Sequence, residues 1–429
     1  MIVSPVQHVS KIKTSGPRRV PEYNKNMKYD FNTPVNRIGT DCAKWDNRKM
    51  VFGTDDVIPM WVADMDFAVA EPITAALRKR IEHPVYGYSW PSPCLVKTMI
   101  ERLERKYGWH VDPEWIVFTP GVIPALAAAL RAFTHPGDSV VINDPVYHPF
   151  WSLVPGAGCR VSASPLKFDG AKYEMDFEDL KRHFAPVGAG FMAEPQPKAM
   201  ILCNPHNPVG RVWTADELKA VGKIAIDAGA IVISDEVHCE LLFDGIKHTP
   251  FASISEEFNQ NSIVCMSASK TFNLAGLAAS VIIIPNPRLR AAFQSTRSGI
   301  LPFPDIMGMT ALEAAFRDGD EWLERLRSYL QGNLDFLVDF FRKRIPKIKV
   351  VRPQGTYLVW LDCHGLGLDR KQLRDFFIRK ARVGLDGGHR FGAGGEGFMR
   401  MNIACTRATL DEALRRIDVA VAGLHTDFS

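Results

Sequence analysis

The chain has 429 residues, of which 46% are hydrophobic and 23% are charged, and its formal net charge is +4. This composition supports a large buried core and excludes an extensively disordered chain. The near balance of basic and acidic residues gives no sign of nucleic-acid binding. No apolar run approaches the roughly 18 residues that a membrane-spanning helix needs.

Residues 1 to 27 read as an N-terminal extension. The segment is rich in basic residues, contains three prolines and lacks the apolar stretch of a secretory signal, so we expect a cytoplasmic protein. The eight cysteines show neither a CxxC pair nor the spacing of a zinc site. We therefore expect reduced thiols and no metal.

From about residue 85 to residue 285, short apolar runs alternate with helical patterns. The runs are Trp115–Phe118, Ser139–Ile142, Ala199–Cys203, Ala230–Ser234, Ser262–Met266 and Ser280–Ile284. A helix is predicted over Val122–Phe133, and a capping box formed by Thr214 and Glu217 opens another. Continuous apolar runs are typical of strands buried on both faces, so this part predicts an α/β fold with a mostly parallel sheet.

The pattern changes after about residue 310. A long helical stretch, Ile306–Arg344, is broken near Gly319, and two strands and a last helix follow over Gly355–Leu361, Phe398–Ile403 and Thr409–Leu424. We predict a large domain over residues 73–305. Residues 306–429 would form a linker helix and a smaller α+β domain, to which residues 28–72 would also belong.

Three short motifs follow predicted strands and contain Asn207, Asp235 and Lys270. The intervals between these residues are 28 (235 minus 207) and 35 (270 minus 235), each enough for one helix and one strand. Because successive parallel strands end at the same edge of a sheet, the three side chains should lie close together.

Their chemistry is that of a pyridoxal phosphate (PLP) site. A partly desolvated lysine has a lowered pKa and forms a Schiff base with an aldehyde. A carboxylate keeps a pyridine nitrogen protonated, and an asparagine amide donates to the phenolate oxygen of the same ring. Serines and backbone amides at a helix start hold a phosphate.

With these motifs in place, the sequence resembles the fold type I PLP enzymes and, within them, the MalY/PatB branch of carbon–sulfur β-lyases. The resemblance extends from about Lys28 to Leu424. Its most specific pieces are Asn204-Pro-His-Asn-Pro-Val-Gly210, Ser267-Ala-Ser-Lys270, Ala63-Asp-Met-Asp-Phe67, Tyr86-Gly-Tyr88 and Asp386-Gly-Gly-His-Arg-Phe-Gly392. It implies a large domain with a mostly parallel seven-stranded sheet flanked by helices, plus a smaller domain.

The resemblance also implies roles for single residues. Lys270 would carry the cofactor and shuttle protons, Asp235 would pair with the ring nitrogen, and Asn207 and His238 would lie near the phenolate oxygen. Tyr147 would stack on the ring. The phosphate would be held by Gly121, Val122, Ser267 and Ser269.

Two further residues would complete the site. Arg400 would bind the substrate α-carboxylate, for which a guanidinium group has the matching bidentate geometry. Tyr88 would reach into the site of a second copy of the chain, where it would contact cofactor and substrate, so the resemblance implies a homodimer.

The expected activity is β-elimination from cysteine S-conjugates such as cystathionine, giving a thiol, pyruvate and ammonia. Many aminotransferases have an arginine eight residues after the lysine, where this chain has Ala278, and its absence favours the lyase. The alternatives are a PLP-dependent aminotransferase of class I/II and a regulatory protein that acts through protein contacts. The residues do not specify the leaving thiol.

Overall fold

The computed structural model describes residues 29–185 and 196–424. The N-terminal extension predicted over residues 1–27 lies outside these ranges. The elements of the fold belong to the unit Phe31–Ser429.

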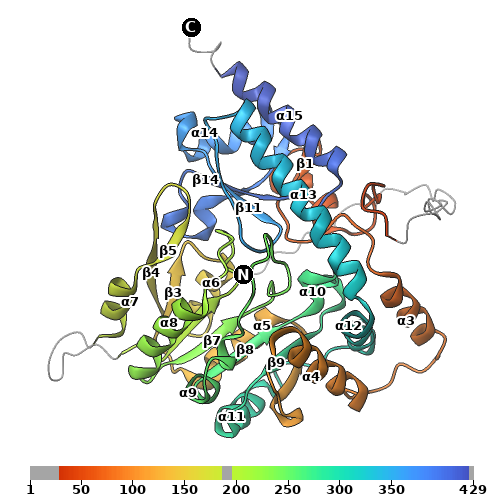
Figure 1. Cartoon of the computed structure of the whole chain (residues 1–429), viewed down its shortest axis with the longest axis vertical. Coiled ribbons are helices and arrows are strands. Elements are labelled where there is room, and N and C mark those ends of the chain that lie inside the picture. The colour runs from red at the N-terminus through yellow and green to blue at the C-terminus, as the bar shows by residue number, and fades with distance from the viewer. Residues whose placement is uncertain (1–28, 186–195, 425–429) are drawn as a thin grey trace, which may run out of the picture. The chain divides into compact units, whose positions relative to one another are not determined.

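The largest element of the fold is an eight-stranded mixed sheet in the order β2-β9-β8-β7-β6-β3-β4-β5 (Figure 1). Its strands are β2 (Ile116–Thr119), β3 (Ser139–Asp144), β4 (Arg160–Phe168), β5 (Tyr173–Met175), β6 (Ala199–Cys203), β7 (Ile231–Asp235), β8 (Ser262–Met266) and β9 (Ser280–Ile283). The central pairs β4-β3-β6-β7-β8 are parallel, and the pairs at both ends are antiparallel.

The sheet has eight strands where seven were expected. All six predicted strands are present within a residue or two, whereas β4 and β5 were not predicted. They lie at one end of the sheet, β5 as the edge strand and β4 beside it, and both mix exposed and buried positions, so neither gives a continuous apolar run. The strand β5 folds back on the end of β4 and extends the sheet beyond its parallel core.

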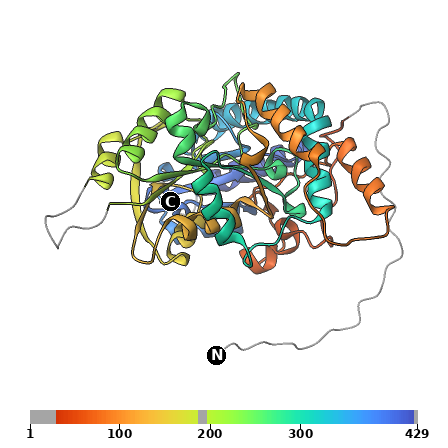
Figure 2. The ribbon, with the colours of Figure 1, turned by 90° about the horizontal axis from the view of Figure 1, so that it is seen from below.

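Helices cover both faces of this sheet (Figure 2). One core cluster joins the sheet to α5 (Val122–Phe133), α6 (Pro149–Gly156) and α11 (Pro287–Arg297). The other joins it to α7 (Phe177–Phe184), α8 (Ala215–Asp227) and α9 (Glu256–Gln260). The predicted capping box is present at the start of α8, where Thr214 accepts from the amide of Glu217 and the Glu217 side chain reaches back.

A second, antiparallel sheet follows in the C-terminal part, in the order β10-β11-β14-β13. Its strands are β10 (Lys349–Val351), β11 (Leu358–Asp362), β13 (Asp386–Gly387) and β14 (Phe398–Asn402). The helices of this part are α12 (Ile306–Asp318), α13 (Asp320–Arg344), α14 (Arg370–Asp375), which continues as a π-helical turn over Phe376–Lys380, and α15 (Arg407–Gly423). Gly319 separates α12 from α13, as the sequence predicted.

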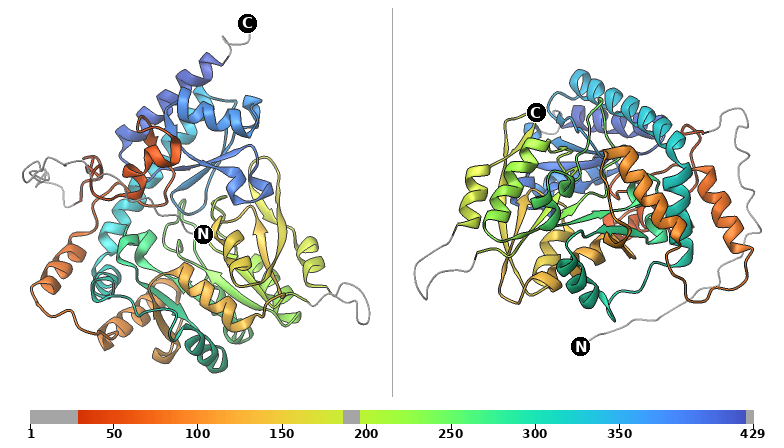
Figure 3. Two further views of the ribbon diagram at one scale, coloured as in Figure 1. Left: turned by 180° about the vertical axis from the view of Figure 1, so that it is seen from behind. Right: turned by 60° about the horizontal axis from the view of Figure 1, so that its bottom comes forward.

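The N-terminal elements lie beside this C-terminal part (Figure 3). The short helices α1 (Ala43–Asp46) and α2 (Arg48–Phe52) precede β1 (Ile58–Pro59), which pairs in parallel with β12 (Val383–Gly384). Two further helices, α3 (Glu71–Ile81) and α4 (Pro93–Tyr107), pack against α12. The division into domains at residues 72 and 305 stays a prediction.

Within residues 29–185 and 196–424, no helix is both long and apolar enough to pass through a membrane. The same residues contain no cluster of three or more histidine, cysteine or acidic side chains that could hold a metal ion.

Candidate functional site

The loops after three adjacent parallel strands carry the three motifs. Asp235 is the last residue of β7 and lies in register with Cys203 of β6 and Cys265 of β8. Asn207 follows β6 by four residues, and Lys270 follows β8 by four residues. The structure therefore brings Asn207, Asp235 and Lys270 to the same edge of the sheet.

Asp235 is a buried carboxylate without a cationic partner. Its side chain is 3% exposed and accepts a hydrogen bond of 3.2 Å from the amide of Val237, and it forms no ion pair within the described residues. Burial raises the pKa of this carboxyl group to about 7. A carboxylate in this state fits a positively charged ring nitrogen, which would supply the missing partner.

Lys270 lies in the one-turn helix α10 (Ala268–Thr271). Its Nζ donates to the carbonyl oxygen of Ala63 at 2.8 Å. Burial and the nearby charge of Arg400 lower the pKa of Lys270 to about 8, while Asp64 and Asp235 act in the opposite direction. A lysine with this pKa has a substantial neutral fraction near pH 7–8, as a nucleophilic amine needs.

Arg400 projects from β14 toward the same place and is 3% exposed. It donates to Oδ1 of Asn207 at 3.0 Å, to the carbonyl oxygen of Trp61 at 2.8 Å and to Oδ2 of Asp386 at 2.9 Å. Its Nε is buried without a hydrogen-bond partner among the described residues. The guanidinium is therefore held from three sides and retains donor capacity for a ligand carboxylate.

The candidate phosphate-binding residues lie at two helix starts. Gly121 and Val122 form the N-terminus of α5, a helix of 12 residues, where free amides and the helix dipole favour an anion. Ser267 caps α10: its hydroxyl donates to the carbonyl oxygen of Ala279 at 2.8 Å and accepts from the amide of Ser269 at 3.0 Å. The Ser267 hydroxyl thus also stabilises the turn that carries Lys270.

Two aromatic side chains border the site. Burial raises the pKa of Tyr147, which lies near enough to Arg400 and Asp235 to be affected by their charges. His238 is buried, its Nδ1 has no hydrogen-bond partner among the described residues, and burial together with the charge of Lys270 keeps its pKa well below the usual value. His238 is therefore neutral and has a ring nitrogen available to a ligand.

Tyr88 lies apart from these residues. It is fully exposed, in the irregular segment between α3 and α4.

Two functional contacts were not predicted from the sequence. Tyr357 donates to the same Ala63 oxygen as Lys270, at 2.9 Å, and Asp386 is the acidic partner of Arg400. The sequence indicated these contacts only indirectly, because Ala63 and Asp386 both lie in motifs that carry the family resemblance. Their contacts depend on how distant segments pack.

The segment that presents the Ala63 oxygen is held on several sides. Asn273 accepts from the amide of Met65 at 2.9 Å and donates to the carbonyl oxygens of Met65 and Phe67, both at 3.0 Å. Asp66 accepts from Arg37, Lys44 and Trp45 at 2.8–3.0 Å. The segment therefore links the Lys270 turn to the N-terminal elements.

We expect Asn273→Gly to lower the free energy of unfolding by about 2–3 kcal/mol, because three hydrogen bonds are lost. Asn273 has a φ of 59°, so Asn273→Ala should cost about 1 kcal/mol more. Chemical denaturation of both variants and the wild type measures these differences. A glycine variant as stable as the wild type would contradict this role of Asn273.

The residues present fit PLP. A lysine of lowered pKa, a buried carboxylate without a cation, a neutral histidine with a free ring nitrogen and a helix N-terminus lie at one edge of the sheet. The lysine matches the aldehyde of that cofactor, the carboxylate its ring nitrogen, the histidine its phenolate oxygen and the helix N-terminus its phosphate.

Comparison with known proteins agrees with this description. The model of the family "Aminotransferase class I and II" matches residues 56–417. The chain is 41% identical to cystathionine beta-lyase PatB of Bacillus subtilis and 32% identical to protein MalY of Escherichia coli, in each case over 92% of this chain and all of the relative. The PLP-containing structure of cystalysin from Treponema denticola superposes with a TM-score of 0.88 at 34% identity, over 93% of this chain and all of cystalysin. The chain therefore belongs to the aminotransferase class I and II family.

Proposed function

We propose that this protein is a PLP-dependent carbon–sulfur β-lyase that converts cysteine S-conjugates such as cystathionine into a thiol, pyruvate and ammonia. The observation that carries the proposal is the 41% identity to a cystathionine beta-lyase over that relative's whole length. The arrangement of Lys270, Asp235 and Arg400 supports it, because it supplies an amine, a ring partner and a carboxylate-binding group.

When bound, PLP withdraws the electron pair that is left at the substrate Cα. Lys270 would hold the cofactor through its aldehyde, and its Nζ, when free and neutral, would take the Cα proton. Asp235 would keep the ring nitrogen protonated. Asn207 would donate its amide to the phenolate oxygen, beside His238.

The remaining residues orient cofactor and substrate. Arg400 binds the α-carboxylate and so turns the Cα–H bond toward Lys270. Tyr147 would stack on the cofactor ring. The phosphate-binding residues in this proposal are Gly121, Val122, Ser267 and Ser269.

Product analysis tests the proposal against its alternatives. The purified, PLP-loaded protein is incubated with L-cystathionine, first without and then with a 2-oxo acid. Pyruvate, ammonia and homocysteine without the oxo acid support the β-lyase. Amino-group transfer that requires the oxo acid would identify an aminotransferase, and no turnover in either assay would favour a regulatory protein.

The pH dependence of stability tests the assignment of Asp235. In the cofactor-free chain, the unfolded state releases this proton near pH 4, whereas the folded state keeps it until about pH 7. Raising the pH through this interval therefore destabilises the folded state, and the loss is constant above it. Cofactor-free Asp235→Asn should be more stable than the cofactor-free wild type at pH 8, by on the order of a few kcal/mol, with little difference at pH 4.

Thermal unfolding at pH 4, 6 and 8 measures this effect. With PLP loaded we expect the wild type to be more stable than Asp235→Asn, because the variant lacks the carboxylate that would pair with the ring nitrogen. A stability difference that does not change with pH would contradict the assignment.

A homodimer is part of the proposal. Large apolar side chains are exposed in the segment that carries Tyr88 and at Phe303, whose ring lies 4.7 Å from that of Trp90, and such a surface is typical of an interface. They are Val85, Tyr86, Tyr88, Trp90 and Phe303. Sedimentation measures the mass, and mixing inactive Tyr88→Ala and Lys270→Ala chains should restore part of the activity if Tyr88 enters the partner's site.

A reducing compartment, the cytoplasm, is also proposed. The eight cysteines are all free thiols, and six of them are buried.

A further inference from the structure

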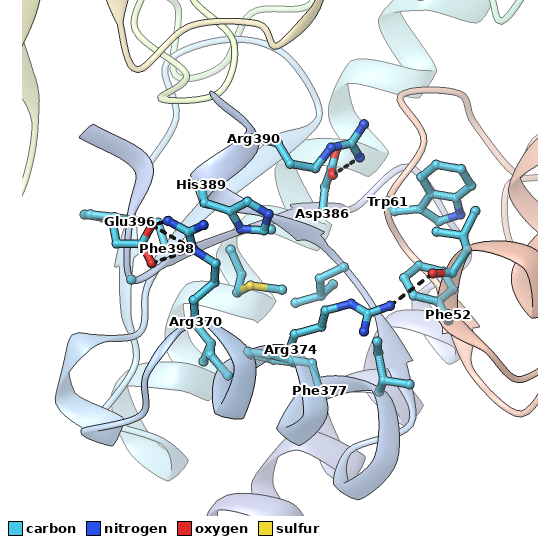
Figure 4. Close-up of a pocket in the computed structure, with 17 residues that line it drawn as sticks. Phe52, Trp61, Arg370, Arg374, Phe377, Asp386, His389, Arg390, Glu396 and Phe398 are labelled. Atoms are coloured by element: carbon cyan, nitrogen blue, oxygen red, sulfur yellow. Dashed lines mark hydrogen bonds and ion pairs between the residues drawn. The ribbon is translucent and has the colours of Figure 1, made fainter. Parts of the chain in front are cut away.

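A cavity of about 250 Å³ lies in the C-terminal part, between α14 with its π-helical turn, the strands β13 and β14, and residues 51–61 (Figure 4). Its inner wall is apolar. Phe52, Leu373, Phe377, Leu385 and Met399 line it, and each of these side chains is less than 9% exposed.

The rim of the cavity is cationic. Arg370, Arg374 and Arg390 line it, together with the imidazole of His389 (Figure 4). Burial and the charge of Arg370 lower the pKa of His389, so this ring is neutral and offers a hydrogen bond rather than a charge.

The positive charges of the rim are not fully compensated. Arg370 pairs with Glu396 at 2.7 Å and Arg390 with Asp386 at 2.6 Å. Arg374 donates to the carbonyl oxygen of Val51 at 3.3 Å and has no carboxylate partner within the described residues. Three guanidinium groups thus face two carboxylates, which leaves one positive charge beside an apolar wall.

One of these two carboxylates is shared with the candidate active site. Asp386 accepts from Arg390 through Oδ1 and from Arg400 through Oδ2. Trp61 also lines the cavity, and its carbonyl oxygen accepts from Arg400. Asp386 therefore neutralises the charge of Arg390 only in part, because the same carboxylate also pairs with Arg400.

We propose that this cavity is a second binding site, which takes a small carboxylate carried on an apolar chain. The carboxylate would pair with Arg374 at the rim, and the chain would lie on the wall formed by Phe377, Leu385 and Met399. Ligand pockets in proteins span roughly 300–1,000 Å³, so a cavity of this size suits a ligand of a few carbon atoms. Direct binding tests this proposal without turnover, so it stands apart from the proposed activity.

The site adjoins Arg400, because Asp386 binds Arg390 through Oδ1 and Arg400 through Oδ2. The carboxylate at Arg374 comes either from a free small molecule or from the far end of a long amino-acid substrate.

Calorimetric titration of the PLP-loaded protein with hexanoate tests the site, with hexylamine as the probe of opposite charge. We expect one hexanoate per chain and no binding of hexylamine. Arg374→Met should weaken hexanoate binding about tenfold or more, the size expected for one charge-assisted pair. Arg342→Met is the matched control, because Arg342 is an exposed arginine that pairs with Asp339 on α13.

Hexanoate that fails to bind, that binds no better than hexylamine, or that binds Arg374→Met as well as the wild type would overturn the proposal. Thermal unfolding of Arg374→Met establishes that a loss of binding is not a loss of fold.

Competition for hexanoate binding separates the two sources, a free carboxylate and the far end of a substrate. It is measured with the Lys270→Ala variant, which should not turn substrates over. Displacement of hexanoate by S-(5-carboxypentyl)-L-cysteine that becomes much weaker when Arg400→Met is added identifies the far end of a substrate, because only a substrate would also be held at Arg400. Displacement that is the same with and without Arg400→Met identifies a site for a free carboxylate. Displacement by L-alanine would place hexanoate at Arg400 and overturn the second site.

Discussion

Lys270→Ala is expected to lower the rate of β-elimination roughly 10³-fold or more, because in the proposed mechanism the same amine holds the cofactor and takes the Cα proton. The structure gives this lysine a pKa of about 8 and a single hydrogen-bond acceptor, the backbone oxygen of Ala63. Steady-state kinetics with L-cystathionine measures the loss.

A second measurement does not depend on turnover. Borohydride reduction, unfolding and mass spectrometry should leave PLP attached to the wild-type chain and not to Lys270→Ala. Lys223→Ala is the control, since Lys223 lies exposed on α8 and pairs with Asp227 at 2.6 Å. Attachment of PLP to the Lys270→Ala chain would refute the assignment of this lysine.

Arg400→Met is expected to affect both stability and substrate binding. Arg400 and Asp386 are each 3% exposed and lie 2.9 Å apart, so removing the guanidinium leaves a buried carboxylate without its inner partner. Breaking a buried pair in this way costs about 3–5 kcal/mol. The loss of the α-carboxylate contact should also raise KM, on the order of 10²-fold, as expected for a bidentate charged contact.

Arg390→Met provides a matched comparison. Arg390 binds the other oxygen of the same carboxylate at 2.6 Å, but its side chain is 41% exposed. Exposed pairs contribute about 0–1 kcal/mol, so this variant should remain close to the wild type in stability.

The double variant Arg400→Met/Asp386→Asn separates the two effects. It should regain part of the stability, because the buried carboxylate that keeps only the half-exposed Arg390 as its partner is removed, while KM stays high. Chemical denaturation and kinetics of the three variants provide the comparison. Equal losses of stability for Arg390→Met and Arg400→Met would show that burial is not what makes the inner pair important.

The central strands could be predicted from the sequence because their signal is local. Runs such as Ala199–Cys203 and Ser262–Met266 are apolar at every position, which is the pattern of a strand covered on both faces. The strands β4 and β5, at one end of the sheet, mix buried and exposed positions and gave no such run. The sheet therefore has two strands more than the six runs, and one more than the seven that the resemblance implied. Asn207, Asp235 and Lys270 were brought together by topology alone, since adjacent parallel strands end at one edge.

Contacts between distant segments were decided only by the tertiary structure. Lys270 and the Ala63 oxygen are 207 residues apart, and Arg400 and Asn207 are 193 apart. No local pattern specifies such pairs, because they depend on how the segment around residues 60–67 and the strand β14 pack on the sheet edge. The sequence by itself determined which segments form the central strands, and it placed Asn207, Asp235 and Lys270 at one edge of the sheet. The order of the strands came from the tertiary structure, and the roles of the three residues stay predictions. The tertiary structure decided which backbone oxygen accepts the hydrogen bond of Lys270 and which carboxylate forms the ion pair with Arg400. The physical reason is that a buried charged group has only the partners that packing brings to it.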